Sequence, residues 1–340
     1  MYQFSHEPIP VISLDYLLRD KLLIWADAGE TSKGIPGSIN FYHNETKNWK
    51  FDLPTSSDVA AIAVDWVSRM IYWSDSTEDQ ISVCSIQGHY CKPVVYDRLK
   101  IKRGSFLQID SLNGRLYFDN QESRQFERTI IESVSLDGGD RKMLIGPQTN
   151  SHRTQEFRVR SMKGMVVATQ NVFLSANNTL FRISIENPSE TQTVYVGGNV
   201  GNIGLVSYSD GYIYWLEDPQ HLTQIHAIPY PYRGENKETT KLDGNGIYMM
   251  RAMSMSNQPL TNSEHYEPRC NDKKCSHLCL RKSNYPNVAC ACPAGIQFKV
   301  TDGLKSTNVC NSIPQKLMVV PGTGGMIFKS ESLWIIASLK

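Results

Sequence analysis

Short segments in which hydrophobic and polar residues alternate recur along residues 1–265 and predict β-strands. Turn pairs such as Asp137-Gly138 and Asp243-Gly244 separate these segments. No long window shows the 3.6-residue periodicity of an amphipathic helix. The pattern therefore predicts that almost all of residues 1–265 form strands and tight turns.

A five-residue signature, an apolar strand with an aromatic pair and a small or acidic residue, recurs within this region. Its copies are residues 23–27 (LIWAD), 71–75 (IYWSD), 116–120 (LYFDN), 172–176 (VFLSA) and 213–217 (IYWLE). Their second residues lie 48, 45, 56 and 41 residues apart. A β-type repeat of roughly 40–50 residues is typical of propeller blades. The fourth copy is the most degraded, since Leu174 and Ala176 replace the aromatic and acidic residues.

An aspartate closes the strand before three of the copies, at Asp15, Asp65 and Asp110. With this feature, the repeats resemble the YWTD repeats of the low-density lipoprotein receptor family, and IAVDWVSRMIYWSD in the second repeat matches them best. The resemblance covers residues 11 to about 311. It implies an all-β fold, a six-bladed YWTD-type β-propeller in which the signature aromatics form core and inter-blade contacts.

Six of the eight cysteines are crowded together, which predicts a small disulfide-stabilised module in an oxidising compartment. Their spacing resembles an EGF-like module, and this resemblance implies the pairs Cys270–Cys279, Cys275–Cys290 and Cys292–Cys310. A zinc site that includes His277 is the alternative, but no C-x2-C pair is present. In residues 266–269, directly before the first cysteine, only Glu267 is acidic, so calcium is not expected.

Cys84 and Cys91 flank the turn pair Gln87-Gly88. A two-residue hairpin loop there places Ile86 opposite His89 and Cys84 opposite Cys91, which permits a disulfide. Two buried free thiols are the alternative interpretation.

Composition and motifs argue against several classes of function. The net charge of +1 creates no field that would attract nucleic acid. The chain lacks GxSxG, HExxH, GxxxxGK[ST] and GxGxxG motifs, so we expect no enzyme activity, catalytic residue, cofactor or bound metal. His221 and His226, with no carboxylate between them, are interpreted as surface or turn histidines. Asn44 and Asn177 begin sequons for N-glycosylation.

The family resemblance implies an extracellular, non-catalytic protein-binding module of an endocytic receptor that contributes to ligand binding or release. The ligand would be a lipoprotein-like, growth-factor or matrix protein. Trp66 matches a docking position of the family, and a partly buried loop anchor is the alternative. Asn113 stands where the third blade often carries a histidine, which argues against acid-driven release. A nidogen-like matrix module and a Wnt co-receptor ectodomain fragment are the alternative functions.

The expected domains are a propeller over residues 1–265, an EGF-like module over 266–311 and a tail over 312–340 that resembles the start of a following propeller. The sixth blade is expected to contain residues 246–255 as one strand and to lack its outer strands, unless residues 312–340 supply them. An open ring would aggregate or need its missing neighbour. No secretory signal or membrane-spanning apolar segment is visible, so we expect a part of a longer secreted or membrane-anchored protein, attached to membranes only through its missing parts.

Overall fold

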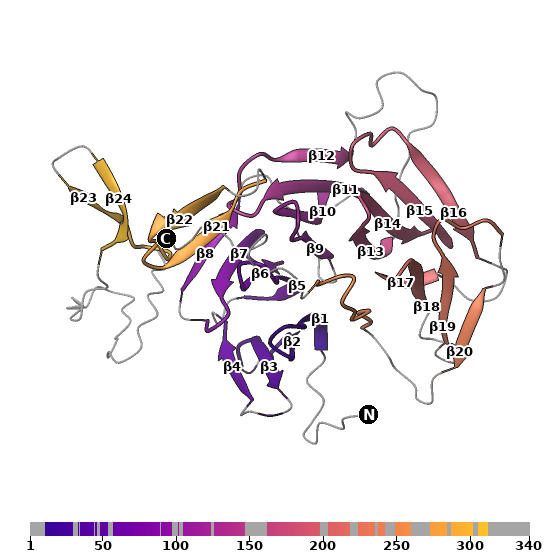
Figure 1. Cartoon of the computed structure of the whole chain (residues 1–340), viewed down its shortest axis with the longest axis horizontal. Helices are drawn as coiled ribbons and strands as arrows, with labels where there is room; N and C mark the ends of the chain where they lie inside the picture. The colour runs from indigo at the N-terminus through magenta and orange to yellow at the C-terminus, as the bar shows by residue number, and fades with distance from the viewer. Residues whose placement is uncertain are drawn as a thin grey trace.

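A computed structural model describes most of the chain and contains β-strands as its regular elements (Figure 1). The described residues are 11–29, 33, 35–43, 45, 48–53, 57–88, 90–96, 101, 105–123, 126–146, 162–197, 203–217, 224–234, 237–241, 249–259, 273–283, 287–301 and 305–311. None of the described residues lies in a helix long and apolar enough to cross a membrane.

Five four-stranded antiparallel sheets account for most of the described strands, and each is a meander of consecutive strands. The first sheet contains β1 (Val11–Leu17), β2 (Leu22–Asp27), β3 (Ser38–His43) and β4 (Trp49–Asp52). The second contains β5 (Val59–Asp65), β6 (Met70–Asp75), β7 (Gln80–Ser85) and β8 (Cys91–Val95). The third contains β9 (Leu107–Asp110), β10 (Arg115–Ser123), β11 (Phe126–Ser135) and β12 (Lys142–Ile145). The last two contain β13 (Met162–Ala168), β14 (Asn171–Ala176), β15 (Thr179–Ser184) and β16 (Thr191–Val196); and β17 (Ile203–Ser209), β18 (Tyr212–Glu217), β19 (Gln224–Pro229) and β20 (Glu238–Lys241).

The sheets are arranged as blades around a common axis. Contacts run from β1 to β5, β5 to β9, β9 to β13 and β13 to β17, which makes these the inner strands (Figure 1). The prediction of an all-β propeller is therefore confirmed, and its described part has five blades. The degraded fourth repeat forms a complete blade, in which Leu174 and Ala176 are buried.

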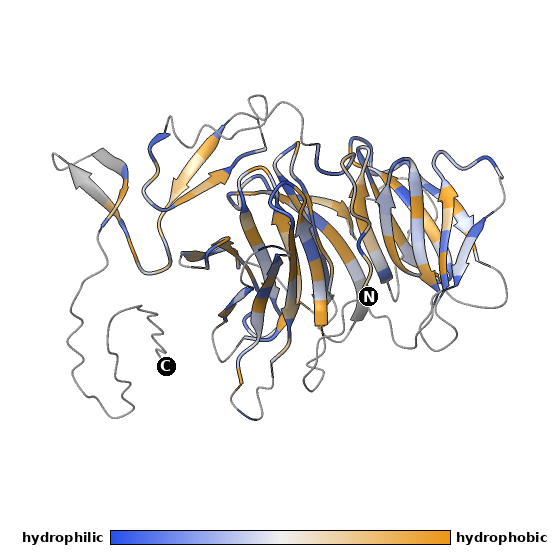
Figure 2. Ribbon diagram, turned by 60° about the horizontal axis from the view of Figure 1, so that its bottom comes forward, coloured by the Kyte–Doolittle hydropathy of each residue, from blue (hydrophilic) through white to orange (hydrophobic). Residues whose placement is uncertain are grey.

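The hydrophobic core lies between neighbouring blades, where four buried clusters each join residues of adjacent sheets, and hydrophobic residues recur along the inner strands (Figure 2). In the second repeat, Ile71 and Trp73 of β6 pack toward the first blade, whereas Tyr72 packs toward the third. Adjacent side chains of a strand point to opposite faces, so one short apolar segment supplies two interfaces. This alternation explains why the signature carries three consecutive large residues.

A gap separates the fifth blade from the first in Figure 1. Residues 249–259, here called the strap, run beside this gap and form no strand in the structure. They include the described part of the segment 246–255 that was expected to supply one strand of a sixth blade. A sixth blade is thus not among the described elements.

Two small sheets follow the propeller: β21 (Leu278–Arg281) pairs with β22 (Val288–Ala291), and β23 (Phe298–Thr301) pairs with β24 (Lys305–Cys310). We call described residues 273–311 the cysteine module. Its first hairpin lies beside β8 in Figure 1, and Leu278 and Leu280 join the buried cluster between the second and third blades. The tail, 312–340, lies outside the described residues.

Candidate functional site

A cavity of about 670 Å³ opens at one end of the ring axis, and we call it the channel-mouth cavity. Its wall comes from the inner strands, from the turns between the first two strands of blades two to five, and from the strap. The lining groups are Asp15, Tyr16, Val64, Trp66, residues 108–113, 166–170, 207–208 and 210–211, Arg251, Ala252 and residues 256–258. All five blades therefore contribute to a single concave surface.

The strap closes the ring at this cavity through side-chain hydrogen bonds. At the first blade, the Gln258 side chain accepts a bond from Leu18 N at 2.8 Å and donates one to Tyr16 O at 2.8 Å. At the fifth blade, Ala252 N donates to Ser207 Oγ at 2.8 Å. The strap therefore joins the two blades that border the gap.

A partly buried network of charged and polar side chains lies in the cavity wall. Arg251 Nε donates to Asp15 Oδ1 at 3.1 Å, and Arg251 Nη1 donates to Gln108 Oε1 at 2.5 Å. The other oxygen of Asp15 accepts a hydrogen bond from Val64 N at 2.8 Å. Arg251 thus connects the strap to the first and third blades, and Asp15 extends the network to the second.

Trp66 is the aromatic residue that sequence reasoning proposed for docking. Its side chain is partly buried, packs against the core between the first and second blades and also lines the cavity. Asn113 lies nearby in the β9–β10 turn, where its amide Nδ2 donates to Asp110 Oδ2 at 2.7 Å. Leu112 also lines the cavity and exposes 43% of its surface. The structure thus places Trp66 and Asn113 at one cavity.

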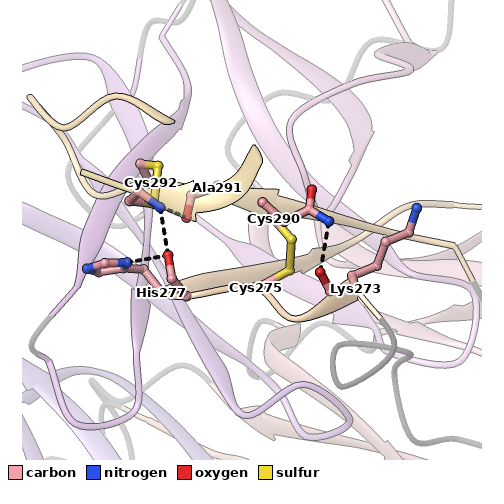
Figure 3. Close-up of a disulfide and its surroundings, with 9 residues drawn as sticks. Lys273, Cys275, His277, Cys290, Ala291 and Cys292 are labelled. Carbon is pink, nitrogen blue, oxygen red and sulfur yellow. Dashed lines mark hydrogen bonds between the residues drawn. A yellow bond between two sulfur atoms is a disulfide. The ribbon is translucent and has the colours of Figure 1, made fainter. Parts of the chain in front are cut away.

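Cysteine pairs stabilise both the second blade and the cysteine module. Cys84 and Cys91 are opposite each other in β7 and β8 and are bonded, in the register expected from the turn pair. Cys275–Cys290 (Figure 3) and Cys292–Cys310 are bonded in the module. Cys279 is disulfide-bonded as well, but its expected partner, Cys270, lies outside the described residues, as does His89.

His226 corrects one sequence interpretation, because it is neither a surface nor a turn residue. It lies in β19 and is only 3% exposed, since its ring packs beside Trp215 with 5.4 Å between the ring centroids. Its two nitrogens contact Thr239 Oγ1 at 2.9 Å and Glu217 Oε2 at 3.2 Å. Burial lowers the pKa of the imidazole, and the hydrogen bond that Glu217 accepts from it opposes that shift only in part. His221 lies outside the described residues.

Asn177, the first residue of a sequon, is exposed in the β14–β15 turn. This turn is at the opposite end of β14 from the β13–β14 turn that lines the cavity. Asn44 lies outside the described residues. Among the described residues, no group of three potential metal-binding side chains gathers in one place.

Three cavity and interface residues were missed by sequence reasoning: Arg251, Gln258 and Arg281. No motif singles out any of the three, and each contacts residues far away in the chain, such as Asp15 at a separation of 236 positions from Arg251. No local signal could have found them.

Comparison with known proteins supports the propeller. No family model matches the chain. The vitellogenin receptor of Solenopsis invicta is 22% identical over 36% of this chain, and the matched part spans only 9% of that receptor. A solved chain from the nidogen/laminin complex superposes with a TM-score of 0.52 at 18% identity, covering 65% of this chain and 76% of that one.

A catalytically inactive virginiamycin B lyase from Staphylococcus aureus has a TM-score of 0.49 at 13% identity, with 71% of this chain and 73% of that chain covered. That likeness is too weak to carry an argument about activity. The blades and the likeness to the chain from the nidogen/laminin complex show a β-propeller fold, and its repeats are similar to the YWTD repeats of the low-density lipoprotein receptor family.

Proposed function

We propose that this chain is a non-catalytic, extracellular protein-binding module and that its ligand docks over the channel-mouth cavity. The observation that carries the proposal is the composition of the cavity wall. The aromatic rings of Trp66 and Tyr208 and the exposed Leu112 lie among the carboxylates Asp110 and Asp210. Apolar anchors surrounded by polar groups are typical of protein docking sites.

The proposed architecture is a six-bladed propeller over residues 1–265 and an EGF-like module over 266–311, followed by the opening of another propeller. The strap would be the innermost strand of the sixth blade. The two sheet faces that border the gap support this assignment, because each leaves apolar or aromatic side chains that a further blade would cover. Leu23 of β2 and Tyr212 and Tyr214 of β18 are partly exposed there. The corresponding faces between described blades are fully buried.

Disulfides and the accessible sequon at Asn177 support an extracellular location, with membrane attachment through other parts of a longer protein. A glycan at Asn177 would project from the face opposite the cavity and leave the proposed binding surface free. We expect glycosidase treatment to increase the gel mobility of the secreted chain, and an Asn177→Gln variant to lose part of that shift. The shift remaining in this variant would be the contribution of Asn44. An unchanged shift would exclude modification at Asn177.

The test of ligand binding uses the secreted chain with purified vitellogenin and purified laminin as probes, suggested by the two relatives. We expect Trp66→Ala to weaken binding of the preferred probe by about 10- to 30-fold, the range for an aromatic interface residue. Tyr96→Ala is the matched control, because Tyr96 is 73% exposed and follows the outer strand β8 at the other end of the blade.

The choice of probe separates two candidate functions. Preference for vitellogenin favours uptake of a lipoprotein-like cargo, whereas preference for laminin favours a nidogen-like matrix role. Equal losses in Trp66→Ala and Tyr96→Ala would contradict docking at the cavity. Failure of both probes to bind would exclude both ligands and leave a growth-factor ligand, as for a Wnt co-receptor fragment, to be tested.

A further inference from the structure

The cysteine module reaches the turns that form one side of the channel-mouth cavity. Leu278 and Leu280 of β21 are buried in one cluster with Tyr72 and Phe118 of the second and third blades. On the outer side, Ala294 N donates a hydrogen bond of 2.9 Å to the Cys91 carbonyl at the start of β8. The module is therefore held against the propeller at two separate places.

Arg281 is the last residue of β21 and is 1% exposed, although it carries a full positive charge. Its Nη1 donates to the carbonyl of Ser111, and its Nη2 lies 3.5 Å from the carbonyl of Leu112. Nη1 also lies 3.6 Å from Oδ1 of Asp65, whose side chain is fully buried. A single guanidinium thus contacts the second and third blades at once.

Asp65 shapes the turn that carries Trp66. Its carboxylate accepts hydrogen bonds from Val67 N at 3.3 Å and Ser68 N at 3.3 Å, and its carbonyl accepts one from Arg69 N at 2.8 Å. A buried carboxylate needs a compensating charge, and the Arg281 guanidinium, 3.6 Å away, supplies one to the side chain that organises this turn. Arg281 is therefore coupled to the position of Trp66.

The β9–β10 turn approaches the module even more closely. Gly114 has a φ of +64°, and a Cβ atom added there would lie 2.7 Å from the Lys282 carbonyl, so no larger residue fits. The same turn presents Leu112 to the cavity, directly after the carbonyl group that Arg281 binds. The backbone of the module thus supports this turn from behind.

We infer that Arg281 is a positioning residue for the proposed binding site, and that the cysteine module sets the geometry of the cavity rim at Trp66 and Leu112. This inference rests on the function proposed above for the cavity. Ligand affinity then depends on a residue that is buried beneath the rim and does not touch the ligand. The module acts as part of the binding site as well as a spacer between domains.

The experiment compares secreted full chains that carry Arg281→Lys or Arg281→Met with wild type. Lysine keeps the charge but lacks the planar fork that reaches two carbonyls and a carboxylate together. We expect amide hydrogen exchange in residues 66–69 and 111–114 to accelerate by roughly tenfold or more in both variants, while residues 169–170 and 210–211 exchange as in wild type. Binding of the preferred probe, vitellogenin or laminin, should weaken in parallel.

Lys282→Ala is the matched control, because Lys282 Nζ lies 3.9 Å from Asp137 at an exposed contact on the outer part of the third blade. The inference would be overturned if Arg281→Lys left exchange in residues 66–69 and 111–114 unchanged. It would also be overturned if exchange accelerated equally in these two turns and in the turns at 169–170 and 210–211. If Arg281→Met is not secreted, Arg281→Lys decides. If neither probe binds wild type, the proposed ligands are wrong, and the exchange pattern still decides whether Arg281 positions the rim.

Discussion

Individual long side chains, and not strand ladders, connect the most distant parts of this protein. Arg251 and Gln258 join the strap to the first blade, and Arg281 joins the cysteine module to the second and third blades. Each spans more than one backbone segment, so its loss leaves several buried groups unpaired. Such positions are more sensitive to substitution than the mostly apolar contacts between the blades.

His226 predicts an acid-sensitive contact within the fifth blade. Burial lowers its pKa, and the nearby Lys237 ammonium lowers it further, whereas Glu217 raises it. The unfolded chain therefore takes up a proton near the usual histidine pKa of about 6.5, before the folded chain does. The free energy of unfolding should therefore decrease as the pH drops below about 6.5, the pKa of histidine in the unfolded chain. The decrease should stop once the pH is below the lower pKa of His226 in the folded chain, because both states are then protonated.

Thermal unfolding at pH 7.5 and pH 5.5 tests this prediction. The loss of Tm between the two pH values should be smaller in His226→Gln, which can keep hydrogen bonds to Glu217 and Thr239 without titrating. Other histidines titrate equally in both proteins and cancel in the comparison. Equal losses of Tm in wild type and variant would show that His226 does not contribute.

At the scale of elements, the five-residue signature is a consequence of the way in which blades pack. Its second residue faces the following blade, as Tyr72 and Phe173 do, while its first and third residues face the preceding blade. For burial between blades, the size and hydrophobicity of the side chains at these positions matter more than an exact match to the YWTD motif. The fourth blade forms without the aromatic and acidic residues because Leu174 and Ala176 are still small enough and apolar enough to be buried.

The hairpin of β7 and β8 is predicted to depend on the Cys84–Cys91 disulfide. The bond closes a loop with a sequence separation of 7, for which chain entropy gives a stabilisation of about 2–3 kcal/mol. We expect Cys84→Ala with Cys91→Ala to lower Tm by roughly 5–10 °C in a domain of this size. Ala294 donates a hydrogen bond to Cys91, so the module should loosen as well.

Ser85→Ala is the control on the same strand. The Ser85 hydroxyl is buried without a hydrogen-bond partner, so its removal should leave Tm unchanged or slightly raised. A double cysteine variant with wild-type Tm would show that strand pairing alone maintains the hairpin.

At the scale of the whole molecule, stability depends on how the strap spans the gap between the fifth and first blades. Gln258→Leu would leave Leu18 N and Tyr16 O without their side-chain partner, which costs about 2–3 kcal/mol in a buried setting. We expect a drop in Tm of roughly 5–10 °C and an increased tendency to aggregate as the first blade detaches. The same substitution at Gln192, which is exposed on β16, is the control. A wild-type Tm for Gln258→Leu would mean that the strap contributes nothing to closure.

The sequence by itself determined the strands, the blade repeat, the cysteine-rich module and the register that pairs Cys84 with Cys91. All of these follow from patterns within a few tens of residues, where alternation, turn pairs and spacing constrain the backbone locally. The cavity and its supports could not be predicted in the same way. Trp66 was singled out only through family resemblance, and nothing marked Arg251, Gln258 or Arg281.

Only the tertiary structure decided which distant groups meet. Asp65 and Arg281 come together because the module folds back over the second and third blades, and Gln258 reaches Leu18 across 240 positions because the chain travels around the ring. A buried charge or amide selects its partner by proximity in space, and that proximity exists only after the blades have assembled. The repeat therefore specifies the blades, whereas the closed ring and the docked module specify the candidate binding surface.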